Sequence, residues 1–180
     1  MKTNLIVIAF ILALGRLQAQ SAPATPAAPA APAAPAASAA AAAPAAPAAT
    51  PALPPLTVNI TTNDSTNFSV SKIEAHPGQT ITVHLKNNGS MPKSVMTHNW
   101  ILLKSGVNLN EYAAAAAAAT TEDFQPKALQ NEVIASIPML GATESAEVTF
   151  TCPTAPGSYY YLCSCYGHAM EGMKGVLIVK

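Results

Sequence analysis

Hydrophobic and polar residues alternate with a period of two along several short stretches between residues 56 and 180. This period places successive side chains on opposite faces of an extended chain, so each stretch is typical of a β-strand with one buried face. Turn-forming pairs such as Asn63-Asp64, Pro77-Gly78 and Pro156-Gly157 separate neighbouring stretches. The pattern predicts an all-β fold, an antiparallel sandwich. The expected strands are 57–61, 68–70, 81–85, 100–103, 133–137, 147–150 and 176–179.

One segment departs from this pattern. Asn110-Glu111-Tyr112 is followed by seven alanines, 113–119, and alanine has the highest helix propensity of any residue. The segment ends before Asp123 to Pro126 and lies between two expected strands. We therefore expect a helical insertion outside the sandwich, docked on it through Tyr112.

The first third of the chain is unlike the rest. Residues 1–19 carry Lys2, an apolar run from Leu5 to Leu14 and a small residue at Ala19, which is typical of a secretory signal peptide with its cleavage site. The run of about ten residues is too short to span a bilayer. We therefore expect a periplasmic or otherwise exported protein.

Residues 20–55 are almost wholly alanine and proline, without charge or aromatic side chains. Regularly spaced prolines prevent the helix that alanine would favour, and nothing here can form a packed core. We predict a disordered, extended linker; its purpose stays open. Residues 56–180 then form one domain of ordinary size.

The charge of the expected domain is close to neutral. Seven lysines face nine acidic residues between 56 and 180, a net charge of about −2. Such a balance argues against nucleic-acid binding, which needs a basic patch. It also provides no strong field to steer a charged partner.

Soft metal ligands gather near the C-terminus. Cys163, His168 and Met173 offer a thiolate, an imidazole and a thioether within eleven residues, and a second imidazole is available upstream at His98. Two imidazoles and a thiolate with a weak thioether are the ligands of a blue-copper electron-transfer site. Because His98 and Cys163 are far apart in sequence, the folded sandwich has to bring them together.

Two segments resemble azurin, a member of the cupredoxin superfamily. Residues 91–100, Met-Pro-Lys-Ser-Val-Met-Thr-His-Asn-Trp, are similar to the azurin pattern Leu-Pro-Lys-Asn-Val-Met-Gly-His-Asn-Trp. Residues 163–168 and 173–175 are similar to its closing Cys-Thr-Phe-Pro-Gly-His and Met-Lys-Gly. The resemblance covers most of 56–180 and includes auracyanin-like relatives. It implies a Greek-key β-sandwich with an extra helix and one type 1 copper ion.

The resemblance also implies the copper ligands, which would be His98, Cys163, His168 and Met173. Spacing alone allows a competing assignment, because Cys165 with His168 and Met173 matches plastocyanin-like loops. Tyr159, four residues before Cys163, and the Gly-His pair at 167–168 favour Cys163. The backbone N–H of Cys165 would then donate to the Cys163 sulfur.

The chain departs from the azurin pattern in several places. Thr97 stands where azurin has a glycine whose carbonyl is a distant copper contact, so we do not count that carbonyl as a ligand. Together with Asn99 and Cys165, Thr97 would lie beside the copper. Four residues separate His168 from Met173, where azurin has three. No cysteine precedes Cys152, so the azurin disulfide has no counterpart; Cys152 and Cys165 would pair or both be buried.

The resemblance implies a function that needs no catalysis. We expect a carrier of single electrons between redox partner proteins; the alternative is a copper storage or delivery protein, and we do not expect an enzyme. Partners would dock on an apolar, methionine-rich surface near His168. By the resemblance the methionines of this surface lie on loops at the metal end: Met91, Met96, Met139, Met170 and Met173.

The tyrosines and the tryptophan are better explained by packing. Alternation would bury Tyr159 and Tyr161 on the same face as Cys163, and Tyr159 suits a tyrosine-corner contact. Trp100 is expected in the core beside His98.

Overall fold

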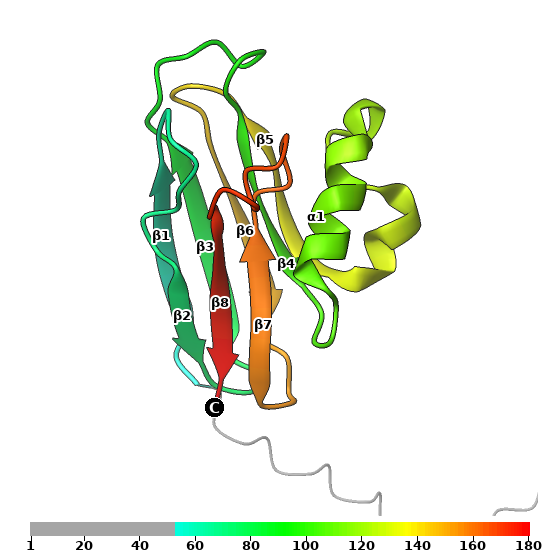
Figure 1. Ribbon diagram of the computed structural model, residues 1–180. Helices are drawn as coiled ribbons and strands as arrows, with labels where there is room; N and C mark the ends of the chain where they lie inside the picture. The colour runs from blue at the N-terminus through cyan, green and yellow to red at the C-terminus, as the bar shows by residue number, and fades with distance from the viewer. Residues whose placement is uncertain (1–52) are drawn as a thin grey trace, which may run out of the picture. The chain divides into compact units, whose positions relative to one another are not determined.

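The computed structural model describes residues 53–180, which fold into two β-sheets and one α-helix (Figure 1). The predicted signal peptide and nearly all of the predicted linker lie outside the described residues. A three-stranded sheet has the order β1 (Leu56–Thr62), β3 (Thr80–Asn87) and β6 (Ser145–Thr151). A five-stranded sheet has the order β2 (Lys72–Ala75), β8 (Lys174–Val179), β7 (Gly157–Leu162), β4 (His98–Leu103) and β5 (Val133–Leu140). The predicted all-β sandwich is confirmed.

The strands are not all antiparallel, and in this respect the prediction is wrong. β1 pairs with β3 in parallel, and β2 pairs with β8 in parallel. β2 belongs to the other sheet, so the chain leaves the first sheet after β1 and returns to it as β3. A strand reached by such a crossover can run in the same direction as its neighbour. The remaining pairs are antiparallel.

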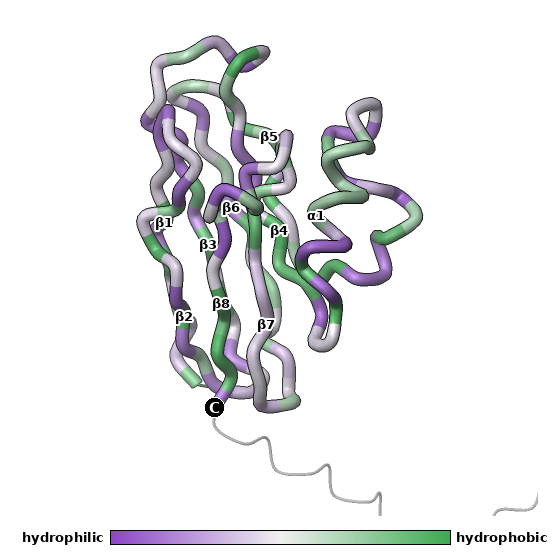
Figure 2. The backbone as a smooth tube through the Cα atoms, in the orientation of Figure 1, coloured by the Kyte–Doolittle hydropathy of each residue, from purple (hydrophilic) through white to green (hydrophobic). Residues whose placement is uncertain are grey.

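Alternation along the strands predicts the core correctly. In β3, Ile81, Val83 and Leu85 are fully buried, while Thr82 and His84 between them are partly exposed. The buried faces of both sheets meet in one hydrophobic cluster, the content of a β-sandwich core. Figure 2 shows the hydrophobic stretches in β4 and β8 and the mixed pattern along β1.

β4 is buried on both faces. Trp100 and Leu102 point into the core, and Ile101 and Leu103 pack on the other side against helix α1 (Leu109–Ala118). The predicted helical insertion is therefore confirmed, and Tyr112 docks it as expected. The Asn108 side chain caps the helix by accepting hydrogen bonds from the backbone N–H groups of Asn110 and Glu111. Two short 3-10 helices follow, η1 (Thr120–Glu122) and η2 (Lys127–Glu132).

Residues 68–70 are a loop and not the predicted strand. The Ser69 side chain accepts a hydrogen bond from the backbone N–H of Thr61, and the Ser69 N–H donates to the Thr61 carbonyl, so this segment folds back on the end of β1. Phe68 is buried without belonging to a strand. The strand β2, which begins at Lys72, was not predicted, because four residues are too few for a clear alternation.

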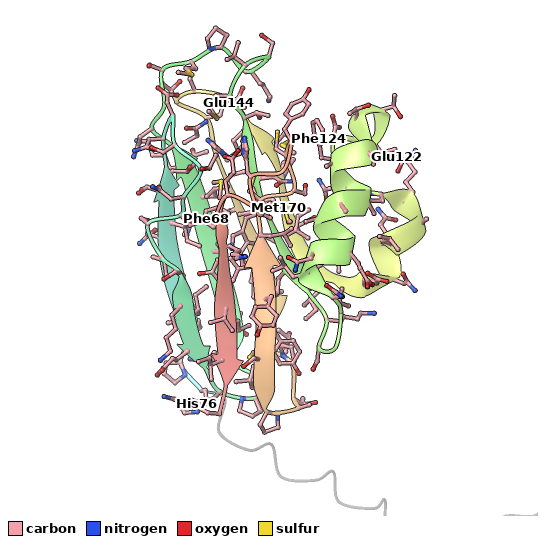
Figure 3. All side chains as sticks on the ribbon, in the orientation of Figure 1. Phe68, His76, Glu122, Phe124, Glu144 and Met170 are labelled. Carbon is pink, nitrogen blue, oxygen red and sulfur yellow. The ribbon has the colours of Figure 1, made fainter. Side chains whose placement is uncertain are left out.

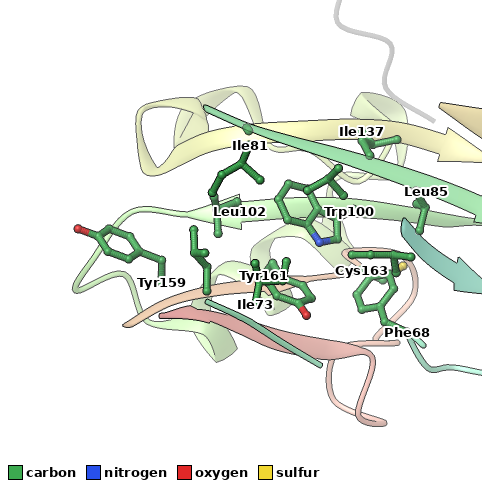
Figure 4. Close-up of a cluster of buried hydrophobic side chains, with 14 of the residues drawn as sticks. Phe68, Ile73, Ile81, Leu85, Trp100, Leu102, Ile137, Tyr159, Tyr161 and Cys163 are labelled. Atoms are coloured by element: carbon green, nitrogen blue, oxygen red, sulfur yellow. The ribbon is translucent and has the colours of Figure 1, made fainter. Parts of the chain in front are cut away.

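Aromatic side chains occupy the centre of the core (Figure 4). The Tyr161 ring lies 5.4 Å from the Trp100 ring and 5.8 Å from the Phe68 ring, centroid to centroid. Trp100 is fully buried, as predicted. The Tyr159 hydroxyl donates to the Ala155 carbonyl at 2.8 Å, which confirms the tyrosine corner. Within residues 53–180, no helix is both long enough and apolar enough to cross a bilayer.

Candidate metal centre

The predicted ligand residues lie at one end of the sandwich. His98 is the first residue of β4, Cys163 comes directly after β7, and Met173 comes directly before β8. His168 lies on the connection between β7 and β8, which we call the ligand loop (residues 163–173). Because β4 and β7 are antiparallel neighbours, the start of one adjoins the end of the other. Sheet topology therefore brings together residues that are 65 positions apart.

Three of these residues form one compact donor group. The ligating atoms of His98, Cys163 and His168 lie within 4.8 Å of one another, and all three residues are buried. The Cys163 Sγ is 3.5 Å from Nδ1 of His168 and 4.0 Å from Nδ1 of His98. Among the described residues, no other histidines, cysteines or acidic residues form such a group.

The orientation of His98 is set by a backbone carbonyl. Its Nε2 lies 2.8 Å from the carbonyl oxygen of Asn63, which can only accept a hydrogen bond. Nε2 must therefore carry a proton, and in the neutral ring Nδ1 keeps its lone pair. That lone pair is on the side of the ring that faces Cys163, which is the arrangement of a metal-binding histidine.

Burial keeps both imidazoles neutral. Desolvation lowers the pKa of His98, and the nearby His168 lowers it further, against the Asn63 hydrogen bond and the Asp64 charge that raise it. Desolvation also lowers the pKa of His168. Because the ordinary value is 6.5, both rings are predominantly neutral at pH 7 and can donate electron pairs.

The Cys163 sulfur lies in an environment that needs a cation. Desolvation raises the pKa of its thiol to about 11, while hydrogen bonds from the backbone N–H groups of Asn99 and Cys165 act in the opposite direction. Those donors stabilise a thiolate but do not compensate its burial. A bound metal ion supplies the missing positive charge, since a coordinating thiol loses its proton outright.

Paired hydrogen bonds join β4 to the ligand loop beside this sulfur. The Asn99 side chain donates to the Ser164 hydroxyl at 2.8 Å, and the Ser164 backbone N–H donates to the Asn99 side-chain oxygen at 2.8 Å. The hydroxyl of Thr97 donates to the Leu140 carbonyl at 3.0 Å and ties the residue before His98 to β5. These hydrogen bonds fix the backbone beside His98 and beside Cys163, and so fix the two donors relative to each other.

Of the two methionines on the ligand loop, only one is buried near the donors. Met173 is fully buried in the cluster that contains Cys163, and its backbone bonds both Cys163 and His168. Met170 is 63% exposed. Met139 lies within β5, so the expectation that all five methionines occupy loops is wrong for that residue. The strand β5 continues three residues past the predicted strand 133–137.

The structure separates the three cysteines by role. Cys163 faces the two imidazoles, whereas Cys165 is buried outside the donor group. Cys152 and Cys165 are both unpaired and buried, which was the second of the two expected outcomes.

Sequence reasoning did not identify Asn63 and Ser164 as parts of the site. A turn signal at Asn63 was visible, but a backbone carbonyl that accepts from a distant histidine has no sequence signature.

The donor set fits a copper ion of the type 1 class. Metal-to-donor bonds of about 2.0–2.3 Å leave neighbouring donors roughly 3.5–4 Å apart in a trigonal arrangement, which matches the two sulfur–nitrogen distances above. The group contains no carboxylate, so a hard cation is disfavoured, and copper binds nitrogen and sulfur ligands more strongly than zinc does. Fold and site together define a mononuclear blue-copper protein.

Known proteins resemble the whole described domain. Residues 56–180 match the family described as copper binding proteins, plastocyanin/azurin family. Auracyanin-A of Chloroflexus aurantiacus is 35% identical over 129 residues, 70% of this chain and 75% of that protein. Azurin of Pseudomonas chlororaphis is 35% identical over 126 residues, 68% of this chain and 97% of azurin. The solved structure of Chloroflexus auracyanin A, a "blue" copper protein, covers 71% of this chain and 100% of its own at 33% identity, with a TM-score of 0.61. The chain belongs to the plastocyanin/azurin family, and the resemblance seen in the sequence is confirmed.

Proposed function

We propose that this protein carries single electrons between redox partners through one copper ion held by His98, Cys163, His168 and Met173. The observation that carries the proposal is the buried His98–Cys163–His168 group, already assembled by the fold. Copper, when bound, supplies the one-electron chemistry by cycling between its cuprous and cupric states. The rigid hydrogen bonds of Asn63 and Asn99 limit how far the donors can move during that change.

Each donor has a distinct task in this proposal. Cys163 couples the metal to the protein, and the N–H groups of Asn99 and Cys165 lower the electron density on its sulfur. His98 anchors the site to β4. His168 is 7% exposed, whereas His98 and Cys163 are fully buried, so His168 is the route by which the electron enters and leaves. Together with the Met173 sulfur these donors fill the coordination positions, which supports a carrier and not an enzyme, because catalysis needs an open position for substrate.

We also propose that redox partners dock over His168. Exposed apolar side chains surround this end of the sandwich: Met91, Val95, Tyr166 and Met170. Flexible thioethers and an aromatic ring provide an adaptable apolar contact for transient partners. The near-neutral charge of the domain fits a partner selected by apolar contact and not by charge steering.

The ligand assignment is tested by visible absorption of the copper-loaded protein. Cys163→Ser should abolish the intense thiolate-to-copper band, because serine offers no polarizable thiolate. Cys165→Ser, the matched control, should retain the band with a small shift. Loss of the band in the Cys165 variant alone would overturn the assignment.

A rate comparison distinguishes an electron carrier from a copper storage or delivery protein. An electron carrier should exchange electrons between its own oxidised and reduced forms rapidly and release copper to a chelator slowly. Rapid copper release with slow electron self-exchange would instead support storage or delivery. Stopped-flow absorbance measures both rates on the same preparation.

We propose, in addition, that the chain is exported and that residues 1–19 are removed. The support is the apolar run behind Lys2 and the family relationship to auracyanin and azurin. Mass spectrometry of protein from the fraction outside the cytoplasmic membrane should show a chain that begins at Gln20. An intact N-terminus at Met1 would contradict cleavage.

A further inference from the structure

The two imidazoles of the metal centre are supported differently. His98 donates through Nε2 to the Asn63 carbonyl, which fixes its ring. Among the described residues, the only polar contact of the His168 ring is with the Cys163 sulfur. The His168 ring also lies 5.1 Å from the tilted His98 ring, centroid to centroid. Apart from these two contacts, its position depends on the backbone of the ligand loop and on the residues that pack against that loop.

Tyr166, two residues before His168, has an unusual backbone conformation for an exposed tyrosine. It is 63% exposed and has a φ of 37°, in the left-handed region that L-residues other than glycine, asparagine and aspartate seldom adopt. Such a conformation persists only where surrounding contacts hold it. The azurin pattern has proline at the equivalent place, and a proline, with φ near −65°, could not adopt this backbone.

The aromatic contact of Tyr166 is with the helical insertion. Its ring meets the Phe124 ring edge-on, with 4.5 Å between the centroids. Phe124 follows η1 and is also left-handed, with a φ of 56°, as is Asp123 before it, with a φ of 51°. The Phe124 ring is buried between the insertion and the ligand loop (Figure 3). The two left-handed residues turn the chain after η1, so that the Phe124 ring points toward the ligand loop.

The residue that follows His168 is held by the same insertion. Ala169 is fully buried in the cluster that α1 forms with β4 and β7. The helix contributes Tyr112, Ala113 and Ala116 to this cluster, and the small alanine side chains allow close approach. The insertion therefore supports the ligand loop on both sides of His168, at Tyr166 and at Ala169.

We propose that the helical insertion is a positioning element for His168, acting through the Tyr166–Phe124 contact and the packing of Ala169. The inference rests on the proposed role of His168 as a copper ligand. The insertion itself supplies no donor atom to the metal centre. It holds the loop backbone in a conformation that keeps the His168 ring directed at Cys163.

The test uses amide hydrogen exchange in the metal-free, full-length protein. Tyr166→Ala and Phe124→Ala should each accelerate exchange at the amides of 166–170 roughly tenfold, the scale of one aromatic pair. The His168 N–H, which donates to the Cys165 carbonyl at 2.8 Å, is the central probe. Phe124 also packs in the core cluster, so the double variant should exchange no faster than Phe124→Ala alone, because both changes remove the same ring contact. Accelerations that multiply, or an equal change throughout β4, would overturn the proposal.

Two further variants separate the contact from other effects. Tyr160→Ala removes an exposed aromatic ring from β7 that makes no ring contact among the described residues, and it should leave the loop amides unchanged. Tyr166→Gly removes the ring and also relieves the left-handed backbone strain. If the amides of 166–170 exchange as fast in the glycine variant as in Tyr166→Ala, the ring contact holds the loop. If they exchange at the wild-type rate in the glycine variant, the proposal is refuted.

A spectroscopic measurement then connects the loop to the metal centre. In copper-loaded protein, Tyr166→Ala and Phe124→Ala should alter the electron paramagnetic resonance signal, while Tyr160→Ala should not. An unchanged signal in both variants would mean that the insertion does not position His168. If the wild type itself showed no thiolate-to-copper band, the proposed function would fail, whereas the exchange data would still decide whether the insertion holds the loop.

Discussion

At the scale of single residues, Gly175 shows how closely the core is packed beside the ligand loop. It belongs to β8 and faces the ring of Tyr161, with which it pairs across β7 and β8. A Cβ on Gly175 would fall inside the van der Waals radius of that ring. The ring cannot move away easily, because its hydroxyl donates to the Val70 carbonyl at 2.7 Å and the ring itself contacts Trp100 at a tilt. The glycine of the Met-Lys-Gly motif is required for space and not for its backbone angle.

Gly175→Ala should therefore destabilise the protein by about 1–3 kcal/mol, the usual cost of overpacking a well-filled core. Urea denaturation followed by tryptophan fluorescence measures the loss. Tyr161→Leu frees space at the same point, so the double variant should lose less stability than the sum of the two single variants. Simple additivity of the two effects would show that the clash is absent.

At the scale of elements, the turn after β1, at Asn63-Asp64, contacts both the metal centre and the loop that leads to His98. The Asp64 carboxylate accepts hydrogen bonds from the backbone N–H of Ser90, from its hydroxyl and from the backbone N–H of Met91, at 2.8–3.2 Å. The neighbouring Asn63 carbonyl accepts a hydrogen bond from the Nε2–H of His98. One turn thus holds the start of the Met91–Met96 loop and the histidine at its end.

These hydrogen bonds make the turn sensitive to acid. The backbone N–H and hydroxyl of Ser90, followed by the Met91 N–H, lower the pKa of Asp64 below its ordinary value of 3.8. A lowered pKa means that the stabilisation is complete above pH 3.8 and is lost as the pH falls through the folded value. Asp64→Asn should remove this part of the acid dependence of unfolding, measured by denaturant titration at several pH values.

Asp123→Asn is the matched control, since the Asp123 side chain accepts no hydrogen bond among the described residues and asparagine tolerates its left-handed backbone. An acid profile that changes equally in both variants would show that Asp64 acts only through its charge.

At the scale of the whole molecule, the metal centre is assembled by the sandwich before any metal binds. β4 and β7 bring the two ends of the site together, and the donors already lie at metal-binding separations. The chain enters the domain at the opposite end, where the Gln79 side chain donates to the Pro54 carbonyl at 2.8 Å. The seven residues of β1 therefore separate this entry point from the metal centre by about 20 Å.

Because the site is preformed, copper removal should leave the fold intact while lowering its stability. Binding to the folded state alone contributes about 2.7 kcal/mol at a free concentration one hundred times Kd, which corresponds to a Tm higher by roughly 10 °C. Calorimetry should show this difference between loaded and metal-free protein, with the same far-ultraviolet circular dichroism for both. Cys163→Ser should show little of the shift. A metal-free protein without β-structure would contradict a preformed site.

The sequence alone predicted those features that depend on local patterns. Alternation located most strands, and the alanine run located the helix, because both depend on which face of a short element is apolar. The wrong predictions share one cause. Phe68 to Val70 alternate like a strand but fold back on β1, and the parallel pairs of β1 with β3 and β2 with β8 depend on a crossover between sheets. Pairing partners are not encoded in the local pattern.

The residue types of the metal centre were likewise determined by the sequence, since thiol, imidazole and thioether chemistry is a property of individual side chains. The position of Tyr159 and the Gly-His pair favoured Cys163 over Cys165, and the tertiary structure places Cys163 beside the two imidazoles. Only the tertiary structure showed that the Asn63 carbonyl orients His98 and that Phe124 packs on Tyr166. Each of these contacts joins residues far apart along the chain through backbone positions and ring orientations. Such geometry arises only when the sheets pair and pack, so no local stretch of sequence contains it.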